Sequence, residues 1–167
     1  ILLLFIPDQV RFDDATPAAW TLLDGSGAVL RSGTAALKDA PRGDRTIAVA
    51  PVNHILFIET ALPQVSPAKR NALLRYAIED KLTIDPSTVH AVVLGRTPHD
   101  KHVVAAIDRS WLGGALGWMK QAAIEPDSLV SSASAMPVNA GEWAVAIDGA
   151  HGFARRADGF VYNFDVG

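Results

Sequence analysis

Two glycine-bearing turns are the segments of this chain that come nearest to a phosphate-binding site. Their sequences are Asp24-Gly25-Ser26-Gly27 and Asp148-Gly149-Ala150-His151-Gly152. Some nucleotide sites hold phosphate oxygens with the backbone N–H groups of two such turns, because glycine allows a close approach. Asp-Gly pairs are equally typical of plain hairpin turns. We interpret both segments as hairpin turns, and nucleotide binding at residues 148–152 is the alternative.

The turn after the first apolar segment lacks the residues that a second phosphate contact needs. It reads Pro7-Asp8-Gln9-Val10-Arg11-Phe12-Asp13, has no glycine and contains the bulky Phe12. One phosphate turn without its counterpart does not hold a nucleotide. The chain also has no GxxxxGKS, GxxxxGKT or GxGxxG motif. We therefore expect no cofactor and no cofactor-binding residue.

The histidines offer one weak candidate for a metal site. His99 and His102 lie three residues apart in a polar turn, and zinc takes histidine ligands at short spacings of this kind. Lys101, which lies between them, adds a positive charge that disfavours a bound cation. We interpret the segment as a solvated turn and expect no metal-binding residue.

Nucleophilic and acid–base catalysis also lack their usual patterns. Ser26 lies between two glycines but does not fit the GxSxG motif, in which a helix follows the serine. The adjacent carboxylates Asp13-Asp14 and Glu79-Asp80 point to different sides of a strand or helix. Four further serines have no base near them in the sequence: Ser128, Ser131, Ser132 and Ser134. We expect no catalytic residue, and hence no enzyme.

The composition is that of an ordinary soluble globular protein. The chain has 167 residues, of which 49% are apolar and 20% charged, and its net charge is −3. This charge argues against a nucleic-acid partner, because such partners select clustered Lys and Arg. The absence of cysteine permits a reducing compartment. The apolar run Ile1–Ile6 is far too short to cross a bilayer, which takes about 20 residues, so we interpret it as a buried strand.

Apolar runs bounded by turn residues predict eleven strands. They cover residues 1–6, 20–23, 29–32, 46–50, 55–60, 89–95, 102–107, 128–131, 143–147, 152–156 and 160–164. Hairpin turns at residues 24–27, 97–101, 148–152 and 158–159 join several of them. The pattern also predicts two helices, residues 66–82 and 110–123, and a helical turn around residues 35–39.

The first expected helix is amphipathic. Ser66 is placed to cap its free N–H groups, and Pro67 stands where a missing N–H costs nothing. On a helical wheel the apolar residues fall on one side: Leu73, Leu74, Ala77, Ile78 and Leu82. The opposite side carries polar residues, and the charged group Arg75, Glu79 and Asp80 is one possible partner contact; a solvated face is the blander interpretation.

The four tryptophans are mostly expected in the core. Trp111 belongs to the apolar side of the second helix, and Trp20 and Trp143 lie in strands. Trp118 falls at the edge of the apolar side of its helix. If it is exposed, it is a candidate anchor for a protein partner.

Two stretches of the chain carry a resemblance to a known family. Residues 55–82 read ILFIETALPQVSPAKRNALLRYAIEDKL, and Ile107-Asp108-Arg109-Ser110-Trp111-Leu112 begins a helix followed by Ile124-Glu125-Pro126-Asp127-Ser128-Leu129-Val130. Together they resemble, over about fifty residues, the cytoplasmic region of type II secretion system protein L. One departure is Ser131-Ser132, where the family pattern has a Pro-Glu pair.

The order of the elements indicates a mixed α/β (α+β) fold. The resemblance implies an actin-like ATPase or ribonuclease H-like fold with an inserted strand-helix-strand subdomain. On that basis we expect residues 1–50 and 108–125 to form a first ribonuclease H-like half and residues 51–107 the insert. Residues 126–167 either begin a second half, which would then be truncated, or form a closing sheet.

The resemblance also implies a function. The chain would be a non-catalytic cytoplasmic scaffold domain of a type II secretion machine, at the cytoplasmic face of the bacterial inner membrane. Its partners would be the N-terminal domain of the secretion ATPase and other inner-membrane secretion components, with a homodimer possible. It would meet the membrane only through an apolar helix beyond Gly167. The alternative is a nucleotide-binding actin-like protein, of the pilus-assembly type or a sugar-kinase-like phosphotransferase. The sequence leaves the partner-contacting residues unknown.

Overall fold

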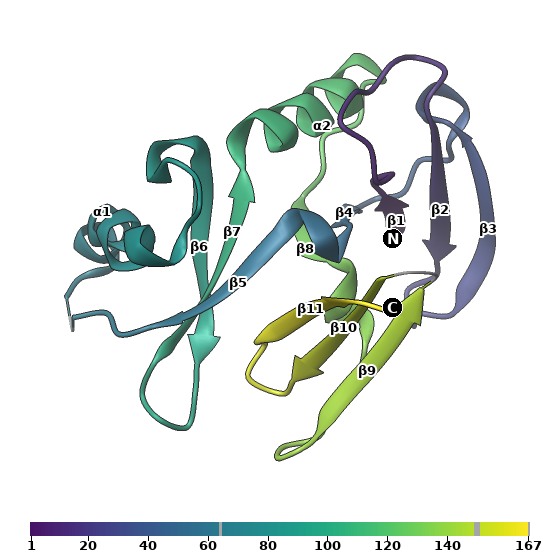
Figure 1. The fold of residues 1–167 in the computed structure, drawn as a ribbon. Coiled ribbons are helices and arrows are strands. Elements are labelled where there is room, and N and C mark those ends of the chain that lie inside the picture. The colour runs from purple at the N-terminus through teal and green to yellow at the C-terminus, as the bar shows by residue number, and fades with distance from the viewer. Residues whose placement is uncertain (64, 149–150, 167) are drawn as a thin grey trace. The chain divides into compact units, whose positions relative to one another are not determined.

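The computed structural model describes residues 1–63, 65–148 and 151–166, and its chain divides into two compact units (Figure 1). Unit 1 comprises Ile1–His54 and Ser110–Ser132. Unit 2 comprises Ile55–Arg109 and Ala133–Gly167. The subdomain boundaries expected from the sequence stay a prediction.

Unit 1 is built on a five-stranded sheet in the order β3-β2-β1-β4-β8. The strands are β1 (Leu2–Phe5), β2 (Pro17–Leu23), β3 (Val29–Ala36), β4 (Thr46–Ala50) and β8 (Ser128–Ser131). β1, β2 and β3 are joined by antiparallel pairing, whereas β1–β4 and β4–β8 are parallel. Leu2 and Leu4 of the central strand are fully buried, so the core of the unit lies against the middle of this sheet.

One long helix packs in unit 1. It is α2 (Arg109–Gln121), and its buried side chains are Trp111, Ala115, Trp118 and Met119. Its spacing of i, i+4, i+7 and i+8 forms one apolar stripe. Short 3-10 turns of this unit lie at Leu37–Asp39 and Val52–His54, and a further one, Ser132–Ala135, begins at its last residue.

Unit 2 contains an antiparallel sheet in the order β5-β7-β6, covered on one face by a helix. Its elements are β5 (Ile55–Thr60), α1 (Pro67–Ile78), β6 (Val89–Arg96) and β7 (His102–Asp108), with 3-10 turns at Glu79–Lys81 and Pro86–Thr88. Leu74 and Ile78 of α1 pack with Ile58, Val104 and Ala106 of the sheet in one buried cluster. The Thr60 hydroxyl donates to the Ala77 carbonyl at 2.9 Å and fixes the helix over the strand.

The remaining strands of unit 2 form a second antiparallel sheet. They are β9 (Trp143–Asp148), β10 (His151–Arg156) and β11 (Val161–Asp165), in the order β11-β10-β9. Directly opposed residues share a face, and Val145, Ala154 and Tyr162 form one such row. Neighbouring residues alternate faces, so Val161 is buried while Tyr162 is 60% exposed.

The predicted fold class is confirmed: the structure is mixed α/β, and each predicted strand has a counterpart among the described residues. The bounds differ at some ends. The largest difference is β3, expected to end at Ser32 but continuing to Ala36 because its pairing with β2 extends to Pro17. Among the described residues, no helix has both the length and the apolar character that crossing a membrane requires.

Two details predicted for α1 are wrong. The side chain of Ser66 makes no capping hydrogen bond; with Pro67 at the start of the helix, one of the free N–H groups is already absent. Leu73, expected on the buried side, is 38% exposed. The cluster is centred on Leu74 and Ile78, and the residue before Leu74 lies about 100° away around the helix axis.

Candidate functional site

The loop between β1 and β2, in unit 1, is the segment that the sequence analysis compared with a phosphate-binding turn. In the structure this loop packs against aromatic rings of α2. The Phe12 ring stacks on Trp118 with centroids 5.1 Å apart and meets the Trp111 ring edge-on at 6.0 Å. Gly114 of α2 faces the same ring: a Cβ there would lie 3.7 Å from it, an ordinary van der Waals distance. The side chain that we singled out as bulky is thus the one that attaches the loop to α2.

Hydrogen bonds hold the same loop to the same helix. Trp111 Nε1–H donates to the Gln9 carbonyl at 2.8 Å, and Trp118 Nε1–H donates to the Asp13 carbonyl at 3.0 Å. Both indoles are buried, where an unpaired N–H would be costly. The two bonds therefore fix the backbone of the loop at two points.

Four backbone N–H groups of this loop, those of Gln9, Asp13, Ala15 and Thr16, donate to acceptors within it. The N–H of Gln9 donates to the Pro7 carbonyl, and the N–H groups of Asp13 and Thr16 close a short turn. The N–H of Ala15 donates to Asp13 Oδ1 at 3.0 Å. The Thr16 hydroxyl, together with that N–H, lowers the pKa of the Asp13 carboxyl. Backbone N–H groups that donate to acceptors within the loop do not point outward to bind an anion.

A carboxylate–imidazole pair lies at the start of the loop. Asp8 Oδ1 is 2.7 Å from His54 Nε2, and Asp8 Oδ2 accepts from Asn53 Nδ2 at 2.6 Å. The His54 ring stacks on Trp111, with centroids 4.2 Å apart. The pair thus joins the loop to the 3-10 turn before β5. A carboxylate–imidazole pair can relay a proton, but the contacts of this pair with Asn53 and with the Trp111 ring serve to hold the loop in place.

The turn at Asp24 is a hairpin, as expected. The N–H groups of Ser26 and Ala28 donate to Asp24 Oδ1 at 2.8 and 2.9 Å, and Gly27 has a φ of +87°. The Ser26 hydroxyl is the main cause of the lowered pKa of Asp24. In the other glycine turn, Gly149 and Ala150 lie outside the described residues, so the alternative of nucleotide binding there stays untested. Beside it, His151 Nδ1 lies 3.1 Å from Asp165 Oδ1.

The two histidines of the polar turn do not point to a common site. His99 is exposed, whereas His102 is buried, with its Nε2 accepting from Arg96 Nε at 3.3 Å. Within the described ranges, no three His, Cys, Asp or Glu residues are grouped so that they could hold a metal ion.

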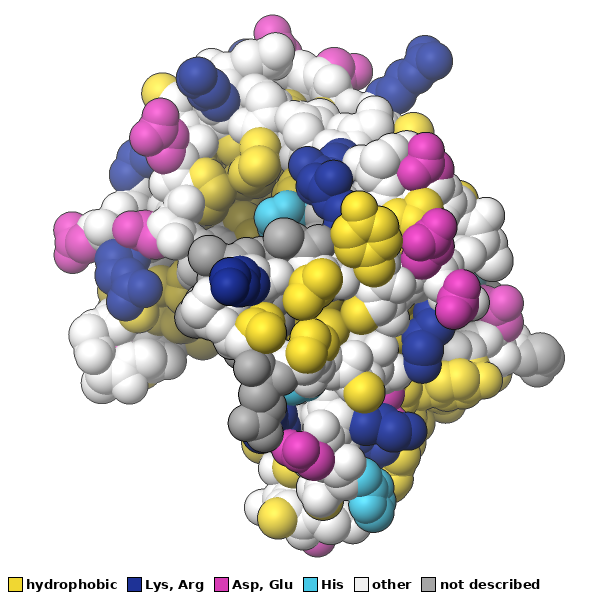
Figure 2. Space-filling model, turned by 90° about the vertical axis from the view of Figure 1, so that its left-hand side faces the viewer, with side chains coloured by type: hydrophobic (Ala, Val, Ile, Leu, Met, Phe, Trp, Pro, Cys, Tyr) yellow, Lys and Arg dark blue, Asp and Glu magenta, His cyan; other side chains and the backbone are white. Residues whose placement is uncertain are grey.

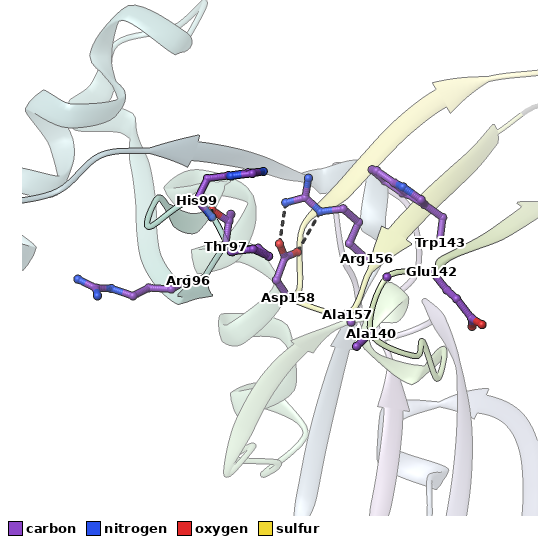
Figure 3. A pocket seen from close by; sticks show the side chains of 11 residues that line it. Arg96, Thr97, His99, Ala140, Glu142, Trp143, Arg156, Ala157 and Asp158 are labelled. Atoms are coloured by element: carbon purple, nitrogen blue, oxygen red, sulfur yellow. Dashed lines mark hydrogen bonds and ion pairs between the residues drawn. The ribbon is translucent and has the colours of Figure 1, made fainter.

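A second polar cluster, missed by the sequence analysis, lies in unit 2 around Arg156. Its guanidinium donates to Asp158 Oδ2 at 2.7 Å (Figure 3). It also pairs with Glu59. It lies 5.5 Å from the Trp143 ring centroid and 4.8 Å from that of Phe160. The hydrogen bonding that Arg156 donates to the Asp158 carboxylate is the main reason that the pKa of Arg156 is raised.

This cluster forms part of the wall of an open pocket of about 560 Å³. The pocket is lined by the tip of the β6–β7 hairpin, by residues 140–143 and by the β10–β11 turn (Figure 3). Because Arg156 is held between two carboxylates and two rings, its charge is neutralised in place. The arrangement stabilises the turn and its neighbours; it does not present a reactive group.

The Asp158 carboxyl should make the stability of the domain depend on acid. Burial raises its pKa, but bonds from Arg156 and the Phe160 N–H outweigh burial, so the folded-state pKa lies below the ordinary value. The stabilisation is present above the unfolded pKa of about 3.9 and is lost as pH falls through the folded pKa. We expect the urea midpoint of the wild type to fall more steeply below about pH 4 than that of Asp158→Asn; equal slopes would contradict this.

One of the tryptophan expectations is wrong, and the condition attached to another is not met. Trp118 is 4% exposed, so it is not a surface anchor; the loop after β1 covers it. Trp143, expected in the core, is 52% exposed. It lies on the outer face of β9 with Val145 and Ile147, which are 57% and 62% exposed. Trp20 and Trp111 are buried, as predicted.

Comparisons with known proteins agree with one another. The family model of the type II secretion system protein L matches residues 21–159. The structure is similar to the cytoplasmic domain of EpsL, an inner membrane component of the type II secretion system of Vibrio cholerae, with a TM-score of 0.78 and 18% identity over 98% of this chain and 70% of that one. No curated protein matches the chain by sequence.

The structure is also similar to a solved structure from type IV pilus biogenesis. The PilM-PilN type IV pilus biogenesis complex matches with a TM-score of 0.70 and 14% identity, over 98% of this chain and 61% of that one. At such low identities the two likenesses establish the fold. They confirm the predicted actin-like fold.

Proposed function

This chain belongs to the protein L family of type II secretion systems, and from that premise we propose that it is a non-catalytic scaffold domain of the secretion machine. It would link the secretion ATPase to the inner-membrane platform from the cytoplasmic face. The link to the membrane would be an apolar helix beyond Gly167. Its role in protein export is then mechanical: it holds a partner in place and performs no turnover.

One observation carries the non-catalytic part of this proposal: the loop after β1 is closed by Phe12 against Trp111 and Trp118. A phosphate-holding loop in this position would need outward N–H groups and a close backbone approach. Here the Phe12 ring packs where the backbone would have to approach a phosphate. The N–H groups of Gln9, Asp13, Ala15 and Thr16 donate within the loop. A nucleotide would therefore depend on the turn at residues 148–152 alone.

The proposed partner is the N-terminal domain of the secretion ATPase, with other inner-membrane secretion components as further partners. Two observations on similar proteins support a role in assembly. EpsL is an inner membrane component of its secretion system, and PilM forms a complex with PilN. The exposed apolar residues of unit 2, such as Trp143 and Ile147, also suit a protein that works by contact.

Binding of the purified domain to the N-terminal domain of its cognate secretion ATPase tests the proposal. We expect a saturable complex with a Kd in the micromolar range or tighter, measured by biolayer interferometry or co-elution. The N-terminal domain of an ATPase from a different secretion system is the specificity control. If the domain fails to bind its cognate partner at concentrations of about 100 μM, the scaffold proposal is wrong.

A further inference from the structure

We propose that the outer edge of β6 is a docking strand, on which an extended segment of a partner, carrying a carboxylate side chain, pairs with residues 89–93. The inference rests on the proposed function in one respect, because we take the segment to belong to the N-terminal domain of the secretion ATPase. The docking edge is defined as the backbone of Val89–Val93 together with the side chains of Arg75 and Arg109.

β6 is the terminal strand of its sheet. In the order β5-β7-β6 it pairs with β7, and no other described strand pairs with it. Residues of an antiparallel strand turn their N–H and C=O groups alternately toward the neighbour and away from it. Arg109 Nε–H donates to the Val89 carbonyl at 2.7 Å, and from this contact we infer that the carbonyl faces away from β7. By alternation, the backbone groups of Ala91 and Val93 then face outward as well.

A groove follows this edge. It has a volume of about 430 Å³, and the described residues that line it are Leu74, Arg75, Val89–Val93 and Arg109. All five consecutive strand residues line it, which is what a groove alongside a strand requires. The other wall is α1, and Figure 2 shows hydrophobic side chains exposed among charged ones on the side of the molecule that carries α1. An added strand would lie in this groove.

Beyond Val89, whose carbonyl already accepts from Arg109, the edge has little protection against strand addition. Natural edge strands are often blocked by proline, lysine or an early bulge. β6 contains no proline or lysine, and its irregularity falls between Val93 and Gly95, beyond the groove. On the face away from α1, Val92 is 41% and Leu94 51% exposed. Alternate apolar side chains of a partner strand would cover Val92, while main-chain bonds would give the affinity.

The charges of the groove select the chemistry of the partner. Its charged side chains among the described lining residues are those of Arg75 and Arg109, with His90 as a further titratable group, and none of these lining residues is acidic. Arg75 is exposed near the end of α1. Two guanidinium groups beside a strand edge complement a carboxylate, for which arginine offers paired donors. An acidic residue flanking an apolar extended segment is therefore the expected ligand.

Hydrogen exchange of individual amides, followed by NMR on the complex with the N-terminal domain of the secretion ATPase, tests this inference. We expect the amides of Ala91 and Val93 to exchange at least about tenfold more slowly in the complex. Arg75→Glu should weaken binding about tenfold. Lys69→Glu is the matched control, because Lys69 is exposed on the same helix and does not line the groove; it should bind like the wild type.

The outcomes separate this inference from the proposed function. If the complex forms but the exchange of Ala91 and Val93 is unchanged, the docking strand is wrong and the scaffold role stands. The same holds if Arg75→Glu and Lys69→Glu bind equally well. If no complex forms, the proposed function is wrong. The docking-strand inference is then wrong as well, because the partner that supplies the extended segment does not bind.

Discussion

Replacing Trp118 with alanine is expected to destabilise the protein by about 3–5 kcal/mol, the usual cost of removing a large buried aromatic side chain. Trp118 is 4% exposed and stacks on Phe12 with centroids 5.1 Å apart. Its indole N–H also donates to the Asp13 carbonyl, so the substitution removes one of that carbonyl's two donors and leaves the Thr16 N–H. The loss should appear as a lower urea midpoint, followed by circular dichroism.

Leu116→Ala is the matched control for this prediction. Leu116 lies on the same helix but is 39% exposed, so its truncation should cost no more than about 1 kcal/mol. The larger loss should come with faster amide exchange in the loop after β1, because the loop loses one of its two indole contacts. Equal costs for the two substitutions would show that the ring packing of this loop is not what holds it.

The second large effect is expected for Ile78→Ala, at about 2–5 kcal/mol. Ile78 is fully buried where α1 covers the sheet of β5, β6 and β7. The cavity left behind would face Val104 and Ala106, which are fixed in the central strand and cannot close over it easily. Because α1 forms a wall of the groove along β6, the variant should also bind its partner less tightly.

Tyr76→Ala tests whether the loss of stability in Ile78→Ala comes from the lost buried side chain and not from a change in helix propensity. Tyr76 lies two residues earlier on α1 and is 75% exposed. Its replacement by alanine, a better helix former, should leave the urea midpoint nearly unchanged. If Tyr76→Ala were as destabilising as Ile78→Ala, the packing of α1 described above would be wrong.

The strands could be predicted from the sequence because their signals are local. Apolar runs such as Thr46–Ala50 and Ile55–Thr60 end at turn residues, and both have the predicted bounds in the structure. The turn at Asp24–Gly27 likewise depends on residues within one hairpin. Pairing with a neighbour is less local, and it is the reason that β3 runs beyond its expected end.

The exposure of single tryptophans could not be predicted in the same way. Trp118 lies at the edge of the apolar side of its helical wheel. It is buried because Phe12, more than a hundred residues earlier, stacks on it, and a helical wheel contains no information on such distant contacts. Trp143 lies in a strand as expected, but the strand alternates between two faces, and only the fold decides which face is covered. A helical wheel or a strand alternation shows how often buried residues recur along an element, but it does not show which face of the element is buried.

The polar contacts of the candidate sites show the same limit. Asp8 and His54 are separated by 46 residues in the sequence, and Arg156 and Glu59 by 97. No spacing motif marks such pairs, since each partner is an ordinary residue of a turn or strand. The sequence did single out Phe12 in the loop after β1 as a bulky residue, and in the structure its ring packs against Trp111 and Trp118.

The central claim, that this domain works by holding a partner and not by reacting, is tested most directly by titrating it with Mg-ATP in an isothermal calorimeter. The account predicts that the heats of injection equal those of dilution up to about 1 mM nucleotide, for a sample that still binds the N-terminal domain of the secretion ATPase. A saturable heat with a micromolar Kd would contradict it, and would direct attention to the turn at residues 148–152.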